Sequence, residues 1–260
     1  MTAPSAAVSG VTIDLSGRRA LVTGGSRGIG AACCRLLARA GCDVALNYRR
    51  RGDAAQQVVH EIEALGRRGV ALAADAANPQ MVAVMVESAV EFLGGLDIIV
   101  GNAGIWTDGA VEKMTDADWG RMVAVNLSGP FHLCRAAVPH LRRSPAPSIT
   151  LIASTAGQRG EAFHSHYAAT KGGMLALVRS WAVELAPIRV NAVSPGWIRT
   201  DMTEPFLRPE TIDASLREAI PLGHPGEPKD VAGPVLFLAS EMACHMTGAV
   251  LNVNGGAVLA

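Results

Sequence analysis

The fold is decided by the stretch Thr23-Gly24-Gly25-Ser26-Arg27-Gly28-Ile29-Gly30, which stands between the first apolar run of the chain and a helical pattern. Glycines at a strand-to-helix turn let the backbone approach a ligand closely, and free amides at the helix start attract phosphate. In the first βα turn of a doubly wound sheet, such a loop predicts a phosphate cradle. The alternative is a plain turn. The residues expected to form the cradle are Gly24, Ser26, Arg27, Gly28, Ile29 and Gly30.

The rest of the chain alternates short β-rich runs with helical patterns, which is typical of repeated βαβ units. The β-rich runs are almost continuously apolar, as expected of strands covered on both faces. The predicted strands are Ala20–Thr23, Val44–Tyr48, Val70–Ala73, Ile98–Gly101, Ile149–Ala153, Arg189–Val193 and Val250–Asn252. The predicted helices are Gly28–Ala40, Asp53–Gly66, Pro79–Leu93, Asp116–Leu141, Ser165–Leu185 and Lys229–Ala239. We therefore predict an α/β fold with a doubly wound, Rossmann-like, seven-stranded parallel sheet and helices on both faces.

The composition fits one domain spanning residues 1–260. Of the 260 residues 49% are apolar, and 23 basic residues balance 23 acidic ones. Neutrality and scattered arginines argue against a nucleic-acid partner or a membrane-binding face. We expect residues 1–15 to be a frayed leader without signal-peptide character. Residues 198–221, rich in Thr, Glu and Pro, are expected to form a mobile cap over a cleft.

Five cysteines, Cys33, Cys34, Cys42, Cys134 and Cys244, lack paired C-x-x-C spacing. This odd set favours reduced, buried thiols in the cytoplasm. Neither disulfides nor a metal site is expected.

Tyr167 and Lys171 are four residues apart in a helical pattern, which places both side chains on one face. A phenol with a pKa near ~10 is a poor acid at neutral pH, but an ammonium group beside its oxygen lowers that pKa. With Ser154 upstream, such a pair can give a proton to a forming alkoxide. Taken alone, the spacing also fits a solvent-facing pair.

Five motifs in this order resemble the short-chain dehydrogenase/reductase family over roughly residues 15 to 256. They are the glycine loop, Gly101-Asn102-Ala103-Gly104 after the fourth strand, Asn126 in a helix, Ser154 after the fifth strand, and Tyr167 with Lys171. The resemblance implies that Ser154 orients a substrate carbonyl and that Tyr167 is the acid or base. It implies that Lys171 lowers the tyrosine pKa and holds the nicotinamide ribose. Asn126 would support a water relay to the lysine, although a buried structural amide explains it equally well.

The resemblance also implies cofactor contacts beyond the glycine loop. Asn102, with Ala103 and Gly104, should border the adenosine-side ribose and tie the central strands together. Asp75 and Ala76, after the third strand, should meet the adenine. The positions flanking the nicotinamide amide are Pro195, Gly196, Ile198 and Thr200. Independently of the family, the carboxyl ends of the strands in an open α/β sheet line one crevice.

The residues after the second strand indicate which nicotinamide cofactor is bound. A carboxylate there would repel a 2′-phosphate, whereas arginine attracts it. Tyr48 occupies this position, followed by Arg49 and Arg50, and Arg27 lies inside the glycine loop. We therefore predict NADP as the preferred cofactor, with a solvated run of charges as the alternative.

The substrate is less clear from the sequence. Two segments most resemble 3-oxoacyl-(acyl carrier protein) reductases in sequence: the residues around Tyr167, and Asn191-Ala192-Val193-Ser194-Pro195-Gly196. This predicts a ketone, foremost a 3-oxoacyl thioester, reduced by NADPH. The alternatives are a sugar, steroid or other secondary alcohol, or a cofactor-binding sensor with little catalysis. The short connection 184–189 lacks a basic residue before Arg189 and puts carrier-protein docking in doubt, while Arg142 and Arg143 could supply a basic landing site.

Four further expectations concern the surroundings of the site, one helix and the assembly. His164 and His166 are interpreted as substrate-wall or surface residues, since a third metal ligand is missing. Trp106 either lines the pocket or packs against neighbours. Pro234 should kink its helix or shift the helix start. Apolar residues around much of helices 116–141 and 165–185 predict pairing between subunits, as in a homotetramer.

Overall fold

A computed structural model describes residues 12–207 and 218–259. Seven parallel strands form one sheet in the order β3-β2-β1-β4-β5-β6-β7, which confirms the predicted fold class. The strands are β1 (Arg19–Val22), β2 (Asp43–Tyr48), β3 (Gly69–Ala73), β4 (Ile98–Gly101), β5 (Ser148–Ile152), β6 (Arg189–Pro195) and β7 (Val250–Val253). The order reverses between β1 and β4, so their carboxyl ends open a crevice at that point.

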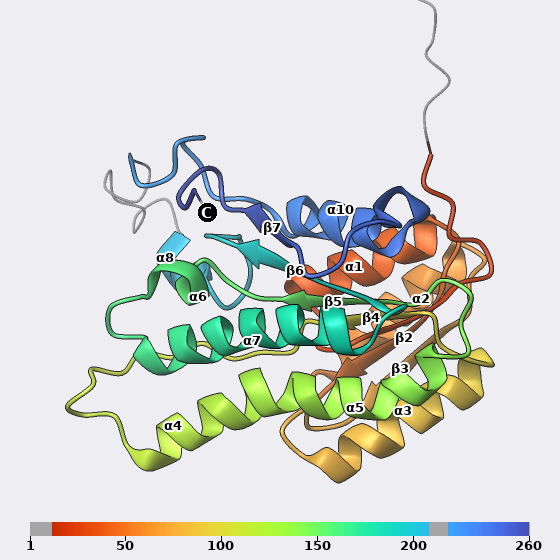
Figure 1. The fold of residues 1–260 in the computed structure, drawn as a ribbon, viewed down its shortest axis with the longest axis horizontal. Helices are drawn as coiled ribbons and strands as arrows, with labels where there is room; N and C mark the ends of the chain where they lie inside the picture. Colours follow the sequence, from red (N-terminus) through yellow and green to blue (C-terminus); the bar gives the residue numbers. More distant parts are fainter. Residues whose placement is uncertain (1–11, 208–217, 260) are drawn as a thin grey trace, which may run out of the picture.

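Helices cover both faces of the sheet (Figure 1). One face carries α1 (Gly28–Arg39), α2 (Gly52–Ala64) and α10 (Pro228–Ala239), and the other carries α3 (Pro79–Leu93), α5 (Gly129–Leu141) and α7 (Ser165–Glu184). Each face has its own apolar cluster, built around Leu37 and Leu46 on the first and around Leu21 and Leu151 on the second. The central strands are buried from both sides, which explains their continuous apolar character.

The predicted helix Asp116–Leu141 is divided. The α-helix α4 (Asp116–Val123) passes into a π-helical turn, η1 (Ala124–Ser128), before α5 begins. Pro130 has no amide hydrogen and cannot donate to the carbonyl of Asn126, so a regular α-helical ladder is impossible here. The wider turn carries Asn126 into the interior of the protein.

Three short elements were not predicted: α6 (Ala156–Arg159), α8 (Glu204–Leu207) and the 3₁₀ turn η2 (Glu241–Ala243). Each is too short to show a helical period in the sequence. The helix α10 begins at Pro228 and contains Pro234, so its start is not displaced to that proline.

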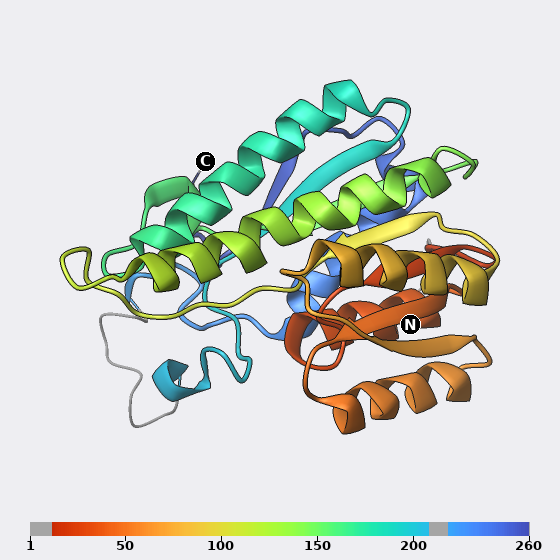
Figure 2. The same ribbon diagram turned by 90° about the horizontal axis from the view of Figure 1, so that it is seen from below.

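The expected leader and cap lie only partly within the described residues. Residues 1–11 and 208–217 are outside them. Leu15, at the end of the expected leader, is buried, and its amide donates to the carbonyl of Ala40. Within the cap, Ile198, Leu207 and Ile220 are buried. Residues 198–207 reach over the carboxyl end of the sheet (Figure 2).

Four of the five cysteines are buried free thiols, but Cys244 is exposed. The prediction of buried thiols was wrong for Cys244, because it follows the surface turn η2.

Among the described residues, no helix is long and apolar enough to cross a membrane. No group of three or more His, Cys, Asp or Glu side chains in the described parts could hold a metal ion.

Candidate active site

The glycine loop connects β1 to α1, and its first and last glycines, Gly24 and Gly30, lie close together. Gly24 and Gly28 adopt left-handed φ angles of 64° and 53°, which favour glycine. A Cβ on Gly30 would lie 2.2 Å from the carbonyl oxygen of Gly24. Arg27, the N-cap of α1, makes no side-chain capping bond, so the first amides of the helix are free to bind an anion. These features fit a dinucleotide phosphate.

Asn102 ties this loop to β4. Its Nδ2 donates to the carbonyl oxygens of Thr23 at 2.9 Å and Gly24 at 3.1 Å. The Thr23 hydroxyl in turn accepts a hydrogen bond from the backbone N–H of Asn102 at 3.0 Å. The ends of the two central strands are thereby held at a fixed separation.

A cleft of about 410 Å³ runs along the carboxyl ends of the strands. It is lined by all of the predicted cofactor-binding residues except Gly30, which is buried behind the loop. Sequence reasoning missed Asn47, Arg51, Ala74, Ile105, Val125, Ile152, Ala153, Asp201, Met202 and Thr203. Most of these follow or end a strand, as the crevice rule could have indicated, whereas Asp201, Met202 and Thr203 come from the cap.

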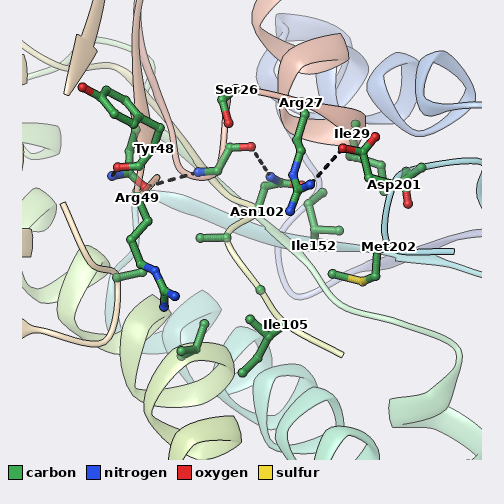
Figure 3. A pocket seen from close by; sticks show the side chains of 18 of the residues that line it. Ser26, Arg27, Ile29, Tyr48, Arg49, Asn102, Ile105, Ile152, Asp201 and Met202 are labelled. Atoms are coloured by element: carbon green, nitrogen blue, oxygen red, sulfur yellow. Dashed lines mark hydrogen bonds and ion pairs between the residues drawn. The ribbon is translucent and has the colours of Figure 1, made fainter. Parts of the chain in front are cut away.

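Basic side chains line the cleft near the glycine loop and the end of β2 (Figure 3). Arg27 pairs with Asp201 at 2.8 Å, and Arg49 lies 3.5 Å from Asp75. Arg50 lines the same cleft. An anionic group entering here would meet Arg27 and Arg49, which each already have a carboxylate partner.

Asn47 holds the end of β2 in place below these cations. Its buried Nδ2 donates to the carbonyl oxygens of Leu72 at 3.2 Å and Ala74 at 3.0 Å, while Oδ1 accepts from the amide of Gly24 at 3.3 Å. One amide side chain thus connects β2, β3 and the glycine loop.

Ser154, Tyr167 and Lys171 all line the cleft. Lys171 Nζ lies 5.7 Å from the centroid of the Tyr167 ring and donates to the carbonyl of Ile152 at 2.6 Å. Ser154 Oγ accepts from the amide of Ala156 at 3.1 Å, which sets its direction at the start of α6. The three side chains come from the end of β5 and the first turns of α7.

The electrostatics of this group differ from the sequence expectation. Burial raises the pKa of Tyr167 to about 12, Ser154 opposes that rise, and the Glu161 carboxylate adds to it. Burial lowers the pKa of Lys171 to about 8. The resemblance implied that Lys171 lowers the pKa of Tyr167, whereas in this structure burial has the largest effect and the pKa of the phenol is raised. The Lys171 ammonium donates to the backbone carbonyl of Ile152.

Asn126 does not line the cleft. It is fully buried in η1, where Oδ1 accepts from the amide of Ile105 and Nδ2 donates to the carbonyl of Ile105, both at 2.8 Å. Asn126 therefore fixes the segment after β4. A Cβ on Gly104 would lie 3.3 Å from Asn126 Oδ1 and 3.8 Å from Lys171 Nζ, so the amide and the ammonium flank one glycine.

A smaller cavity of about 70 Å³ continues from the cleft past Ser154 and Tyr167. Its wall includes Trp106, Trp197 and Glu161. The Trp106 indole N–H donates to Glu161 at 3.3 Å. Phe206 packs edge-on against Trp106 at 5.1 Å between ring centroids.

The chain is similar to known oxidoreductases over almost its whole length. A family model described as "Enoyl-(Acyl carrier protein) reductase" matches residues 24–258. The chain is 40% identical to an L-rhamnose 1-dehydrogenase (NAD(P)(+)) from Sphingomonas, over 93% of this chain and 96% of that protein. It is 38% identical to a 3-oxoacyl-[acyl-carrier-protein] reductase from Staphylococcus aureus, over 92% and 97%.

The chain belongs to the short-chain dehydrogenase/reductase family. A short-chain dehydrogenase from Burkholderia cenocepacia, solved in complex with NADP, superposes with a TM-score of 0.88 at 38% identity, covering 94% of this chain and 98% of that one. A carveol dehydrogenase from Mycobacterium avium, in complex with NAD, gives 0.89 at 32% identity, covering 95% and 99%. As a member of the short-chain dehydrogenase/reductase family, the protein is an NAD(P)-dependent oxidoreductase acting on CH-OH or C=O groups.

Proposed function

We propose that the protein is an NADPH-dependent reductase of a ketone, with a 3-oxoacyl thioester as the first candidate substrate. The observation that carries this proposal is the position of Ser154, Tyr167 and Lys171 in the same cleft as the free amides of the glycine loop. Bound nicotinamide would supply the hydride.

The residues of the chain would stabilise and protonate the oxygen that receives charge. The Tyr167 hydroxyl, with its pKa raised to about 12 by burial, is protonated at neutral pH and available as a donor. The Ser154 hydroxyl would bind the same oxygen, which favours the transition state over the ground state. Buried Lys171 would stabilise the phenolate that remains after Tyr167 has given up its proton, and it would hold the nicotinamide ribose. Asn126 would act indirectly, because its hydrogen bonds fix the backbone at Ile105. It could also support a water relay to Lys171.

The proposed preference for NADP rests on Arg27, Arg49 and Arg50 at the adenosine end of the cleft. Tyr48, which ends β2, leaves that position without a carboxylate. Asp75 lies beside Arg49 and would meet the adenine. Ala76, Asn102, Ala103 and Gly104 would complete the adenosine side, and Pro195, Gly196, Ile198 and Thr200 the nicotinamide side.

A direct test follows oxidation of NADPH with acetoacetyl-CoA and a panel of other carbonyl compounds. Tyr167→Phe should lose turnover by about a hundredfold or more while binding NADPH with unchanged affinity. A variant that matches the wild type in turnover would refute the catalytic role of Tyr167. A wild-type protein that binds NADPH but reduces none of the carbonyl compounds would favour the cofactor-binding sensor.

A sugar or another secondary alcohol is the second candidate, favoured by the wall of the small cavity. Glu161 offers a carboxylate acceptor for substrate hydroxyls, and Trp106 and Trp197 offer aromatic surface. The L-rhamnose 1-dehydrogenase relative points the same way. Comparing kcat/KM for L-rhamnose oxidation by NADP⁺ with that for acetoacetyl-CoA reduction by NADPH separates the two candidates.

We also propose a cytoplasmic homotetramer. Trp119 on α4, Phe131 on α5 and Val183 on α7 are 47%, 41% and 82% exposed, and these helices run along one face of the molecule (Figure 2). Pairing such faces between subunits would bury them. The buried free thiols suit a reducing compartment. Sedimentation velocity should show a tetramer, and a stable monomer at micromolar concentration would contradict the assembly.

A further inference from the structure

A histidine outside the small cavity beside Tyr167 contacts one residue of the cavity wall, Trp106. The His164 ring lies between two hydrogen-bond acceptors, the carbonyl oxygen of Ala162 at 2.9 Å from Nδ1 and the Asp108 carboxylate at 2.7 Å from Nε2. A neutral imidazole carries one N–H and can donate to only one of them. Flipping the imidazole ring by 180° would place carbon atoms where the nitrogens are, and neither acceptor would then receive a hydrogen bond. Both contacts are satisfied by the imidazolium form, and the His164 side chain is only 11% exposed.

The same ring is stacked on the indole of Trp106. The ring centroids are 4.4 Å apart and the planes differ by 5°. A cation against the face of a tryptophan is attracted by the negative charge of the π system. At its edge, the indole N–H donates to Glu161. Trp106 is thus held on one face by His164 and at one edge by a carboxylate.

The two loops that carry these residues are joined by the backbone as well. The amide of Gly109, next to Asp108, donates to the carbonyl of Phe163 at 2.7 Å. Phe163 has a left-handed φ of 62°, which is unusual for a residue other than glycine and turns the chain just before His164. The segment after β4 and the start of α7 therefore meet at His164.

We propose that His164, held as an imidazolium by Asp108, is a positioning residue that fixes Trp106 as the wall against which the carbonyl substrate binds. This rests on the proposed function in one respect, that the substrate occupies the cavity beside Tyr167. The other titratable groups around the stack are Glu161, at the far edge of Trp106, and His166, which contacts Thr107 at 3.3 Å. Loss of the stack should weaken substrate binding and leave cofactor binding unaffected.

The protonation state can be measured without any substrate. In the ¹⁵N-labelled full-length protein at pH 7.5, long-range ¹H–¹⁵N correlations should show both ring nitrogens of His164 protonated. In Asp108→Ala the same ring should become neutral. A neutral ring in the wild type would overturn the proposal, whether or not the enzyme turns over any probe compound.

The positioning role is tested by separating KM from kcat. His164→Phe keeps an aromatic ring on Trp106 but loses both hydrogen bonds, and Asp108→Ala removes only the carboxylate, whose side chain is 72% exposed. With acetoacetyl-CoA or L-rhamnose, both variants should raise the KM for that substrate about three- to tenfold, with kcat within about twofold and the KM for the cofactor unchanged. His60→Ala, an exposed histidine on α2, is the matched control.

Each result assigns the failure to one hypothesis. An unchanged substrate KM, or a fall in kcat alone, would refute the role of His164 while leaving Tyr167 in place. A raised cofactor KM would mean that the change spreads to the dinucleotide site and would also refute it. Full activity of Tyr167→Phe would instead refute the proposed function.

Discussion

Arg27 on the glycine loop and Asp201 on the cap are 2.8 Å apart, so an ion pair links the two sides of the cleft (Figure 3). Both side chains are more than half exposed, which makes the pair weak on its own. It nevertheless holds the guanidinium that was predicted to bind the 2′-phosphate. A 2′-phosphate that binds Arg27 would therefore compete with Asp201.

Replacing Asp201 should strengthen the preference for NADPH. Asp201→Asn removes the competing charge and is expected to lower the KM for NADPH about two- to fivefold, because an exposed pair contributes at most about 1 kcal/mol. The KM for NADH should not change, since NADH lacks the 2′-phosphate. Steady-state kinetics with both cofactors measures this. Equal changes for the two cofactors would show that Asp201 acts on the cap rather than on Arg27.

Removing the cations should have the opposite effect. Arg49→Ala and Arg27→Ala should each reduce the ratio of kcat/KM for NADPH to that for NADH about tenfold or more, because a charge-assisted contact to phosphate is lost. Arg39→Ala, an exposed arginine at the other end of α1, serves as the control. A wild-type enzyme that prefers NADH would contradict the assignment of NADP.

The two directions of the reaction should depend differently on pH. With its pKa raised to about 12, Tyr167 stays protonated through neutral pH, so kcat/KM for reduction should be constant up to about pH 8. Above that pH, Lys171 loses its proton, since its pKa is lowered to about 8, and reduction should fall. Oxidation requires the phenolate and should rise with pH by up to about tenfold per unit. Lys171→Met should lack the inflection near pH 8, and a wild-type reduction rate that climbs with pH would contradict the acid role.

Acid stability should depend on Asp97 at the opposite end of the sheet. Burial alone would raise the pKa of Asp97, but hydrogen bonds from Arg19 and Ser144 hold it below its ordinary value of 3.8. Since the folded pKa is the lower one, this stabilisation is complete above about pH 4 and is lost as the pH falls through the folded pKa. Asp97→Ala leaves Arg19 without its carboxylate partner and should cost about 3 kcal/mol of unfolding free energy at pH 7. Urea denaturation at pH 7 and pH 3 should show a smaller difference for Asp97→Asn than for the wild type.

Gly30 should not tolerate a methyl group. Gly30→Ala would place a Cβ 2.2 Å from the Gly24 carbonyl oxygen and 2.6 Å from Asn102 Nδ2, which are both fixed. We expect a loss of about 3 kcal/mol or failure to fold. Gly120→Ala is the control, because nothing lies within 4 Å of a Cβ there and the helix α4 favours alanine. Equal stability of the two variants in thermal unfolding would show that the loop can open.

The sequence by itself determined the seven strands, the position of the nucleotide cleft and the main helices, apart from the division of residues 116–141 into α4, η1 and α5. These follow from local information: apolar runs of strand length, helical periodicity, and glycines at the one turn where the backbone must approach itself. Because parallel strands end at a common edge, residues far apart in the chain, such as Thr23 and Asn102, could be assigned to one site.

Only the tertiary structure decided the pKa values of those residues and the side chains with which they pair. The carboxylates of Asp201 and Asp75 neutralise cations that the sequence left unpaired, and burial raises the pKa of Tyr167 where the spacing of Lys171 predicted a fall. Asn126 lies out of the cleft, in the π-helical turn 124–128 that precedes Pro130. Desolvation and pairing across loops depend on distances in space, and no pattern along the chain encodes them.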